Sequence, residues 1–172
     1  RGDAVVLKVL ENDLECEFVA LSGQKRRALL HATHLSDSVA GAKALKDCVR
    51  AGHRLKGCAV LSHGAGGSRL RLTRKAALVE ESSAGADASS AKVGSCLAGY
   101  VHRILPNKCV VRFAGGVVGI VPKSHISDQF VVDPGNHLCL GQTVRCQVTA
   151  AAEGEEGALG LTLKTADDAG TR

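Results

Sequence analysis

The chain of 172 residues contains no tryptophan and no methionine, and aromatic residues make up only 2% of it. No apolar run approaches the ~20 residues that a membrane-spanning helix requires, and no segment has the pattern of a secretion signal. We therefore expect a soluble protein without a membrane partner. Because the chain begins with Arg1, we expect it to be a piece of a longer protein, so the missing targeting signal excludes nothing.

The cysteines do not form a metal-binding or redox pattern. There are seven, an odd number, and no two are separated by the two residues typical of a zinc knuckle or a redox pair. Several lie in apolar runs, as Cys109 does in "KCVVRF", where a thiol behaves as a small apolar group. We expect reduced, unreactive cysteines in a reducing compartment, and neither a metal nor a cofactor.

Catalytic and phosphate-binding motifs are also missing. The sequence contains no G-x-S-x-G, H-E-x-x-H or G-x-x-x-x-G-K-[ST]. "SHGAGGSRL" (62–70) is rich in glycine but precedes no predicted helix, so we interpret it as a hairpin loop. We predict that the chain is not an enzyme and takes no small-molecule substrate.

An internal repeat divides the chain. "RALLHATHLSD" (27–37) aligns with "VGIVPKSHISD" (118–128), and residues 51–75 align without a gap with residues 140–164. Between the copies lies "EESSAGADASSAK" (80–92), whose Ser, Ala and Gly content is typical of a linker. We predict a domain over residues 1–79, a linker over 80–92, a second domain over 93–164 and a tail over 165–172.

Both copies are predicted to be β-barrels. In the second copy, five segments rich in Val, Ile and Leu predict strands over residues 96–105, 108–113, 117–122, 143–150 and 158–163. Gly115 and Gly116 predict a tight turn, and Pro122 ends a strand because it lacks an N–H for the ladder. "KSHISD" (123–128) predicts a single turn, and a further turn is expected at Asp133, Pro134 and Gly135. Five short strands with a long connection after the third favour a closed barrel of the oligonucleotide-binding type. We predict an all-β chain of two such barrels in tandem, with two helical turns over 40–49.

Fixed spacings in the second copy carry a family signature. The pattern G-x-V, G-G, G-[ILV]-[ILV]-x-x-S, G-Q-x-V and L-x-L-[ST] occurs at Gly99, Val101, Gly115, Gly116, Gly119, Ile120, Val121, Ser124, Gly141, Gln142, Val144, Leu159, Leu161 and Thr162. It resembles the S1 RNA-binding domain and covers nearly all of residues 94–164.

A narrower resemblance lies in "VVRFAGGVVGIVPKSHISDQFVVDP" followed by "GQTV". This stretch is similar to the tandem S1 repeats of the nucleolar ribosomal RNA processing family known in animals as programmed cell death protein 11. The resemblance implies a nucleolar protein, single-stranded or precursor ribosomal RNA as its ligand, and assembly proteins of the pre-ribosome as its partners.

The S1 resemblance also implies which positions contact RNA. S1 barrels stack bases on aromatic side chains of the second strand and hold phosphates with nearby basic groups. In the second copy Asn107 and Val110 occupy the two aromatic positions, Pro122 replaces the family histidine, and Ala158 replaces the family arginine. The second copy is therefore predicted to have lost its stacking platform.

The first copy keeps more of these residues. Glu15 replaces the first aromatic, but Phe18, His31 and Arg69 match the second aromatic, the histidine and the arginine. Basic candidates are Lys25, Arg26 and Arg27 in the first copy, with a weaker basic face in the second copy at His102, Arg103, Lys108, Arg112 and Lys123. Tyr100 is a further candidate, because it follows a glycine on the first strand of the second copy and could be exposed to RNA or a partner. Residues 1–79 hold 14 Lys and Arg against 7 Asp and Glu, a net +7, whereas residues 93–172 hold 7 against 7. We expect the first copy to bind RNA in a strongly salt-dependent manner.

Alternatives stay open from the sequence alone. Phe18 also fits a core position, Lys25–Arg27 also fits a solvated hairpin tip, and Phe113 stands at an inward-facing family position. His34 and His125 recur at the same place in both copies, which indicates a structural need in the turn. The scarcity of aromatics favours a second hypothesis, in which both barrels are degenerate and act as a protein scaffold in the pre-ribosome. A third is an S1 module of another translation or RNA-decay protein.

Overall fold

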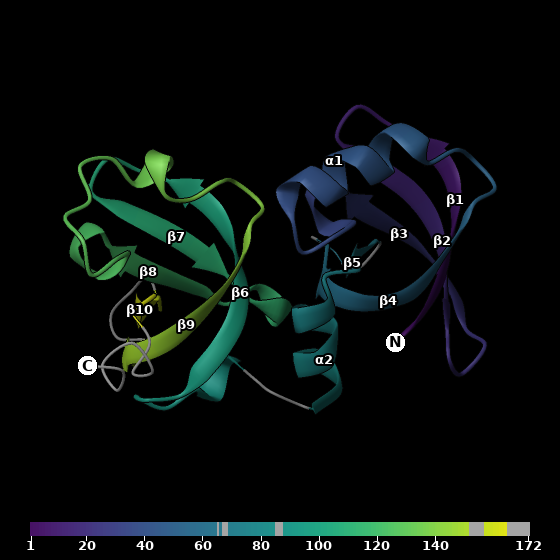
Figure 1. Ribbon diagram of the computed structural model, residues 1–172. Helices are drawn as coiled ribbons and strands as arrows, with labels where there is room; N and C mark the ends of the chain where they lie inside the picture. Colours follow the sequence, from purple (N-terminus) through teal and green to yellow (C-terminus); the bar gives the residue numbers. More distant parts are fainter. Residues whose placement is uncertain (65, 67–68, 85–87, 152–156, 165–172) are drawn as a thin grey trace. The chain divides into compact units, whose positions relative to one another are not determined.

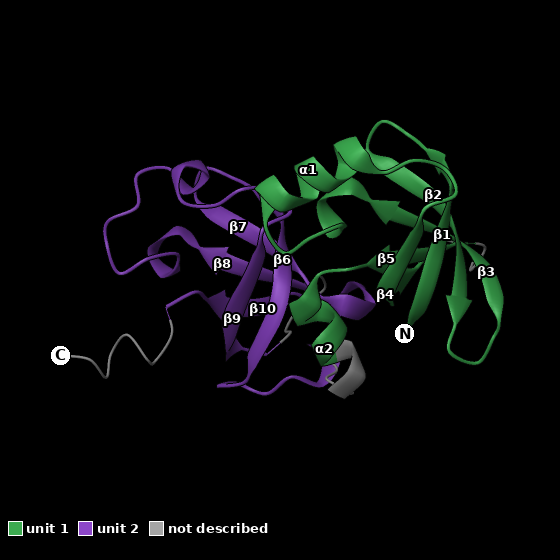
Figure 2. Cartoon of the chain, turned by 45° about the vertical axis from the view of Figure 1, so that its right-hand side comes forward, with its two compact units in different colours: residues 1–86 green, residues 87–172 purple. Residues whose placement is uncertain are grey.

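The computed structural model describes residues 1–64, 66, 69–84, 88–151 and 157–164, with only the backbone of 82–84. The chain forms two compact units, residues 1–86 and 87–172 (Figure 2), and the boundary falls within the predicted linker. Each unit contains one closed barrel of five strands (Figure 1), so the predicted fold class of two five-stranded barrels is confirmed.

The first barrel has the strand order β1-β2-β3-β5-β4. Its strands are β1 (Gly2–Val9), β2 (Asp13–Ala20), β3 (Lys25–His31), β4 (Arg54–His63) and β5 (Leu70–Thr73). Neighbouring strands are antiparallel except β3 and β5, which run parallel. The predicted helical turns form α1 (Val39–Cys48), which begins where the Ser38 hydroxyl accepts a hydrogen bond from the Gly41 N–H.

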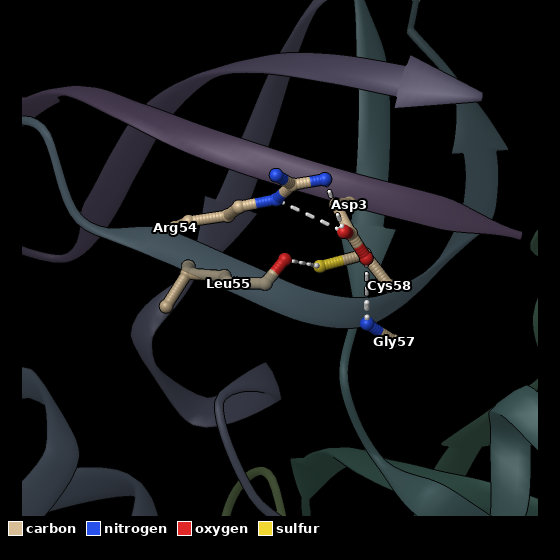
Figure 3. A network of polar contacts seen from close by, with 5 residues as sticks. All are labelled: Asp3, Arg54, Leu55, Gly57 and Cys58. Carbon is tan, nitrogen blue, oxygen red and sulfur yellow. Dashed lines mark hydrogen bonds and ion pairs between the residues drawn. The ribbon is translucent and has the colours of Figure 1, made fainter. Parts of the chain in front are cut away.

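The first barrel closes where β1 meets β4, and a side chain reinforces this junction. The pairing register shifts between Gly2 and Ala4. Beside the shift, the Asp3 carboxylate accepts hydrogen bonds from Arg54 Nε at 3.0 Å and from the Gly57 N–H at 3.3 Å (Figure 3). These bonds favour the charged carboxylate, so the Gly57 N–H and then Arg54 hold the pKa of Asp3 below its usual range. The carboxylate thus joins the two strands where the ladder is interrupted.

The second barrel repeats this topology, with the order β10-β8-β7-β6-β9 and a parallel pair of β8 and β10. Its strands are β6 (Cys96–Ile104), β7 (Lys108–Arg112), β8 (Val118–Pro122), β9 (Thr143–Ala150) and β10 (Leu159–Thr162). Each strand lies inside a segment that the sequence predicted, and β8 ends at Pro122 as expected. Phe113 is 2% exposed and belongs to the barrel core, which confirms its predicted place.

In the described part of the second barrel, three short 3₁₀ turns lie in the connections between strands. Gly115 and Gly116 have φ values of 87° and 85° in η4 (Ala114–Gly116), a conformation that favours glycine, so the predicted tight turn is confirmed. The "KSHISD" segment makes the single turn η5 (Lys123–His125), as predicted. The turn predicted at Asp133, Pro134 and Gly135 is η6 (Pro134–Asn136), with Asp133 as its N-cap.

The segment between the barrels contains a helix that the sequence did not predict. Residues 80–92 were predicted to be a linker, and no helix was predicted there, but α2 (Ala76–Ala84) extends into them and η3 (Ala88–Ser90) follows. The Asp37 carboxylate accepts a hydrogen bond of 2.8 Å from the Ala76 N–H and so satisfies the first donor of α2. The predicted tail over 165–172 lies outside the described residues.

The glycine-rich stretch 62–70, predicted to be a hairpin loop, joins β4 to β5, and its residues 65, 67 and 68 lie outside the described residues. His63 pairs with Leu70, and the Gly64 N–H donates to the Arg69 carbonyl at 2.7 Å. Within the described part of the chain, no helix is long and apolar enough to span a membrane.

Candidate nucleic-acid interface

Three arginines lie along the outer face of β3 and β5, with Arg69 standing immediately before β5. Because side chains alternate along a strand, the buried residues Ala28, Leu30, Leu70 and Leu72 point inward, and their neighbours point outward. Leu29 pairs with Arg71, which places Arg69 at the level of Arg27. All three arginines are exposed. We call Arg27, Arg69 and Arg71 the arginine cluster.

Two glutamates of β2 lie next to this surface. Glu15 and Glu17 point outward from β2, and Arg27 Nη1 lies 3.4 Å from Glu15 Oε1 while Lys25 Nζ lies 3.3 Å from Glu17 Oε1. Exposed ion pairs of this kind contribute little free energy, so a phosphate can replace the carboxylate at low cost. Among the described residues, neither Arg69 nor Arg71 forms an ion pair with a carboxylate.

The predicted stacking residue of the first barrel is in the core. Phe18 is only 3% exposed and packs among the buried residues of its barrel, because β2 alternates inward Leu14, Cys16 and Phe18 with outward acidic residues. Its prediction as an RNA contact is therefore wrong: the ring offers no face to a base. Glu15, at the first aromatic position, lies on the outer face beside Arg27.

Tyr100 is a second correction. The sequence placed it among the residues exposed for RNA, but its side chain is 8% exposed. Its ring meets the His102 ring edge-on, with centroids 6.4 Å apart. A buried ring in this position is no stacking platform.

His31 has a local structural role at the end of β3. The Thr33 N–H donates to His31 Nδ1 at 3.3 Å, and Thr33 Oγ1 lies 2.7 Å from the same nitrogen, so the ring caps η1 (Ala32–His34). Because Nδ1 accepts a hydrogen bond, the neutral ring carries its proton on Nε2. His31 and Arg69 lie toward opposite ends of β3 and β5, so the structure does not bring these two candidates together.

The other predicted cations fall into two groups. Lys25 and Arg26 are exposed at the start of β3, near the arginine cluster. In the second barrel His102 and Arg103 are exposed, whereas Lys108 and Lys123 are half-buried. Burial and the positive charges of Arg112 and Arg103 lower the pKa of His102, which favours the neutral ring.

The second barrel presents no aromatic platform on β7 and β8 within the described residues. On the outer face, Val110 pairs with Ile120, both half-buried, and Lys108 pairs with the exposed Pro122. Asn107 is exposed just before β7. The surface at these family positions is therefore aliphatic and polar.

Arg71 is the residue that sequence reasoning missed. Its signal was present in the alternation "RLRLT" (69–73), which puts both arginines on one face of a strand and both leucines on the other. Among the described residues, no group of three His, Cys, Asp or Glu side chains could hold a metal ion.

Two closed barrels of this strand order, with the glycine spacings of the second copy, define the chain as a tandem pair of S1-type barrels. Residues 92–163 match the RRP5 S1 domain, and the second barrel belongs to that family. The resemblance to the S1 repeats of a ribosomal RNA processing family is thus confirmed.

The relatives extend this similarity over both barrels. The chain is 36% identical over 169 residues to the "Protein RRP5 homolog" of Homo sapiens, covering 96% of this chain and 9% of that protein. It is 28% identical over 139 residues to the "rRNA biogenesis protein RRP5" of Arabidopsis thaliana, covering 80% of this chain and 7% of that protein. The solution structure of GSP13 from Bacillus subtilis has 28% identity and a TM-score of 0.43, covering 48% of this chain and 62% of that one. The chain spans less than a tenth of the length of the two RRP5 relatives.

Proposed function

We propose that the chain is an RNA-binding tandem S1 module of a ribosome biogenesis factor, and that it has no catalytic activity of its own. Its ligand is single-stranded or precursor ribosomal RNA, its partners include assembly proteins of the pre-ribosome, and its place is the nucleolus. The names of the RRP5 relatives support a role in ribosome biogenesis. The observation that carries RNA binding is the arginine cluster on the outer face of β3 and β5.

The chemistry of the arginine cluster favours phosphate. Guanidinium groups present several N–H donors in a planar fork and bind phosphate oxygens in pairs. The net charge of +7 over residues 1–79 adds attraction for a polyanion. Because Phe18 is in the core, the first barrel supplies charge without stacking from this ring. We expect binding that weakens steeply with salt and shows little sequence preference.

The test is RNA binding at several salt concentrations. A labelled single-stranded oligonucleotide is titrated with the whole chain, the double variant Arg69→Ala/Arg71→Ala and a control, Lys43→Ala, whose exposed lysine lies on α1 of the same unit. Each lost phosphate contact lowers the slope of log K against log salt by about 0.7 for a single strand. The double variant should therefore lose about 1.4 of the slope, and Lys43→Ala should keep it.

Two outcomes contradict the proposal. The first is a wild-type chain that does not bind single-stranded RNA at low salt. The second is a double variant whose salt slope equals that of Lys43→Ala, because the RNA phosphates would then not contact Arg69 and Arg71.

A further inference from the structure

A hollow of about 650 Å³ lies on the second barrel, where the start of β7, the end of β8 and the connection between β8 and β9 meet. Its lining includes Asn107, Pro122, Lys123, Asp128, Phe130 and Lys164. The volume falls within the ~300–1,000 Å³ typical of ligand sites. Asn107 and Pro122 stand at family positions for RNA contact, so the hollow borders the S1 surface that binds nucleic acid.

Phe130 presents its ring to solvent at the edge of this hollow. The side chain is 88% exposed, whereas the next residue, Val131, is 4% exposed and belongs to the barrel core. The buried Val131 anchors the connection, and the neighbouring side chain is consequently held outward. Lys123 Nζ lies 5.8 Å from the Phe130 ring centroid, within the range of a cation–π interaction. The hollow thus combines an open aromatic surface with an adjacent cation.

Hydrogen bonds fix the backbone around the ring. The Lys123 N–H donates to the Asn107 carbonyl at 3.0 Å, which joins η5 to the start of β7. The Gln129 N–H donates to Ser127 Oγ at 3.2 Å immediately before Phe130. These bonds hold the rim of the hollow before any ligand binds, which lowers the entropic cost of binding.

The charges of the hollow suit one phosphate. Lys123 and Lys164 are positive, and Asp128 is the one acidic residue among the described residues of the lining. Lys164 Nζ lies 3.8 Å from Asp128 Oδ1, so this pair is close to neutral, and Lys123 supplies the net positive charge. A nucleotide carries one phosphate charge and one flat base, which matches one cation beside one aromatic ring.

The first barrel has no equivalent of this arrangement. In the aligned repeat, Lys123 corresponds to Ala32, and two positions beyond the end of this aligned segment the first copy has Val39 where the second has Phe130. Lys164 corresponds to Lys75, which is fully buried and donates from Nζ to the Ser36 carbonyl at 3.0 Å. The hollow with its exposed ring therefore belongs to the second barrel alone among the described residues.

We propose that Phe130 stacks an unpaired base of single-stranded RNA and that Lys123 holds the neighbouring phosphate. The second barrel then binds RNA through the connection between β8 and β9, at a place displaced from the aromatic positions that Asn107 and Val110 occupy. The proposal rests on the proposed function, because it assumes that the chain binds single-stranded RNA. It assigns a base-stacking role to the barrel whose usual platform is missing.

The test exploits the lack of tryptophan in the chain. Phe130→Trp creates a single tryptophan at the site, and Val132→Trp creates one at a position that is 71% exposed two residues further on. The chains are titrated with oligouridylate and oligoadenylate. We expect quenching of the Phe130→Trp emission, in step with binding, and little change for Val132→Trp.

Affinity gives a second readout. Each base stacked on an aromatic ring typically contributes ~1–3 kcal/mol, so Phe130→Ala should weaken binding about 5- to 150-fold, and Val132→Ala should leave it unchanged. Phe130→Tyr should restore most of the affinity, because it keeps the flat ring. Lys123→Ala should lower the salt slope by about 0.7. Phe130 and Val132 are exposed, so these variants should fold.

The outcomes separate this proposal from the proposed function. If the wild-type chain binds RNA but Phe130→Ala binds equally well and the Phe130→Trp emission is unchanged, the stacking site is wrong and the proposed function stands. If both tryptophan variants are quenched equally, the ring is near RNA without stacking, and the proposal is also overturned. If RNA leaves Phe130→Trp unchanged but a pre-ribosomal protein shifts its emission, the hollow is a protein contact. If the wild-type chain binds no RNA, both proposals fail.

Discussion

His34 Nδ1 lies 3.0 Å from Thr73 Oγ1, a contact between two buried side chains that are 39 positions apart. It joins the turn after β3 to the end of β5, and the Arg74 N–H donates to the His34 carbonyl at 2.9 Å beside it. The second barrel repeats the backbone part, because the Leu163 N–H donates to the His125 carbonyl at 2.9 Å. The His34 side chain thus has a structural role in the turn, as the sequence indicated, whereas the bond repeated at His125 uses the backbone and leaves the recurrence of the second histidine a prediction.

The first prediction concerns the pH dependence of the first unit. Burial, followed by the positive charges of Lys75, His31 and Arg71, lowers the pKa of His34 from 6.5 to about 3. The folded state holds the neutral ring, so His34 contributes full stability above pH 6.5 and loses it as the pH falls from 6.5 toward 3. The expected slope is about 1.4 kcal/mol of unfolding free energy per pH unit over this window.

Two measurements check the His34 prediction. NMR titration of the whole chain should show the His34 ring neutral at pH 5. Hydrogen exchange of the first unit between pH 6.5 and 5 should show a loss of stability that His34→Asn reduces. The matched control is His125→Asn, since His125 occupies the same place in the second copy and is half-buried. A His34 ring that titrates near pH 6.5 contradicts the argument.

The strands of the second barrel were predictable because their signals are local. Glycine and proline punctuate short apolar runs there, and Pro122 ends β8 as its missing N–H requires. The helix α2 was missed for the opposite reason. Its first N–H donates to Asp37, which lies 39 positions earlier in the sequence. A contact between residues so far apart in the sequence cannot be predicted from the composition of residues 80–92.

The candidate site was harder to predict than the fold. Leu14, Cys16 and Phe18 alternate with acidic residues, so the sequence did contain the signal that Phe18 points inward, but the family alignment favoured a stacking role. The site around Phe130 left no local signal. It forms only because the fold brings the start of β7 close to the connection after β8. The spacing of residues in the sequence does not predict that these two segments lie side by side.

The second prediction concerns Gly99. This glycine belongs to the S1 sequence pattern, but the pattern alone does not say why a glycine is needed at this position. A Cβ at this position would lie 2.7 Å from Val111 Cγ1 and 2.9 Å from the Arg112 carbonyl oxygen. Because one of these neighbours is backbone, it cannot move aside easily. Gly99→Ala should therefore destabilise the second unit by about 1–3 kcal/mol through overpacking.

The measurement for Gly99 is hydrogen exchange resolved by unit. Slow amides of the second barrel should exchange faster in Gly99→Ala, and those of the first barrel should keep their rates. Gly135→Ala is the control, because a Cβ at this position would first meet Asp133 Oδ1 at 3.3 Å, the end of a side chain that can move. Equal effects of the two substitutions would refute the packing argument.

The third prediction concerns the seven cysteines, all of which are free thiols. Cys48, Cys96 and Cys139 are exposed, whereas Cys16, Cys58, Cys109 and Cys146 are buried. Burial raises the pKa of Cys16 to about 12 and the pKa values of Cys58 and Cys109 to about 11. Because the thiolate is the nucleophile, these buried groups are both inaccessible and protonated at pH 8.

Alkylation with iodoacetamide followed by peptide mass spectrometry checks this directly. The native chain at pH 8 should take up label at the three exposed cysteines and leave the four buried ones unmodified, and the unfolded chain should take up label at all seven. Cys16 and Cys109 are the sharpest tests, because each is fully buried in the core of one barrel. Labelling of either at the rate of Cys48 would mean that its barrel opens readily, and it would contradict the packing described for that unit.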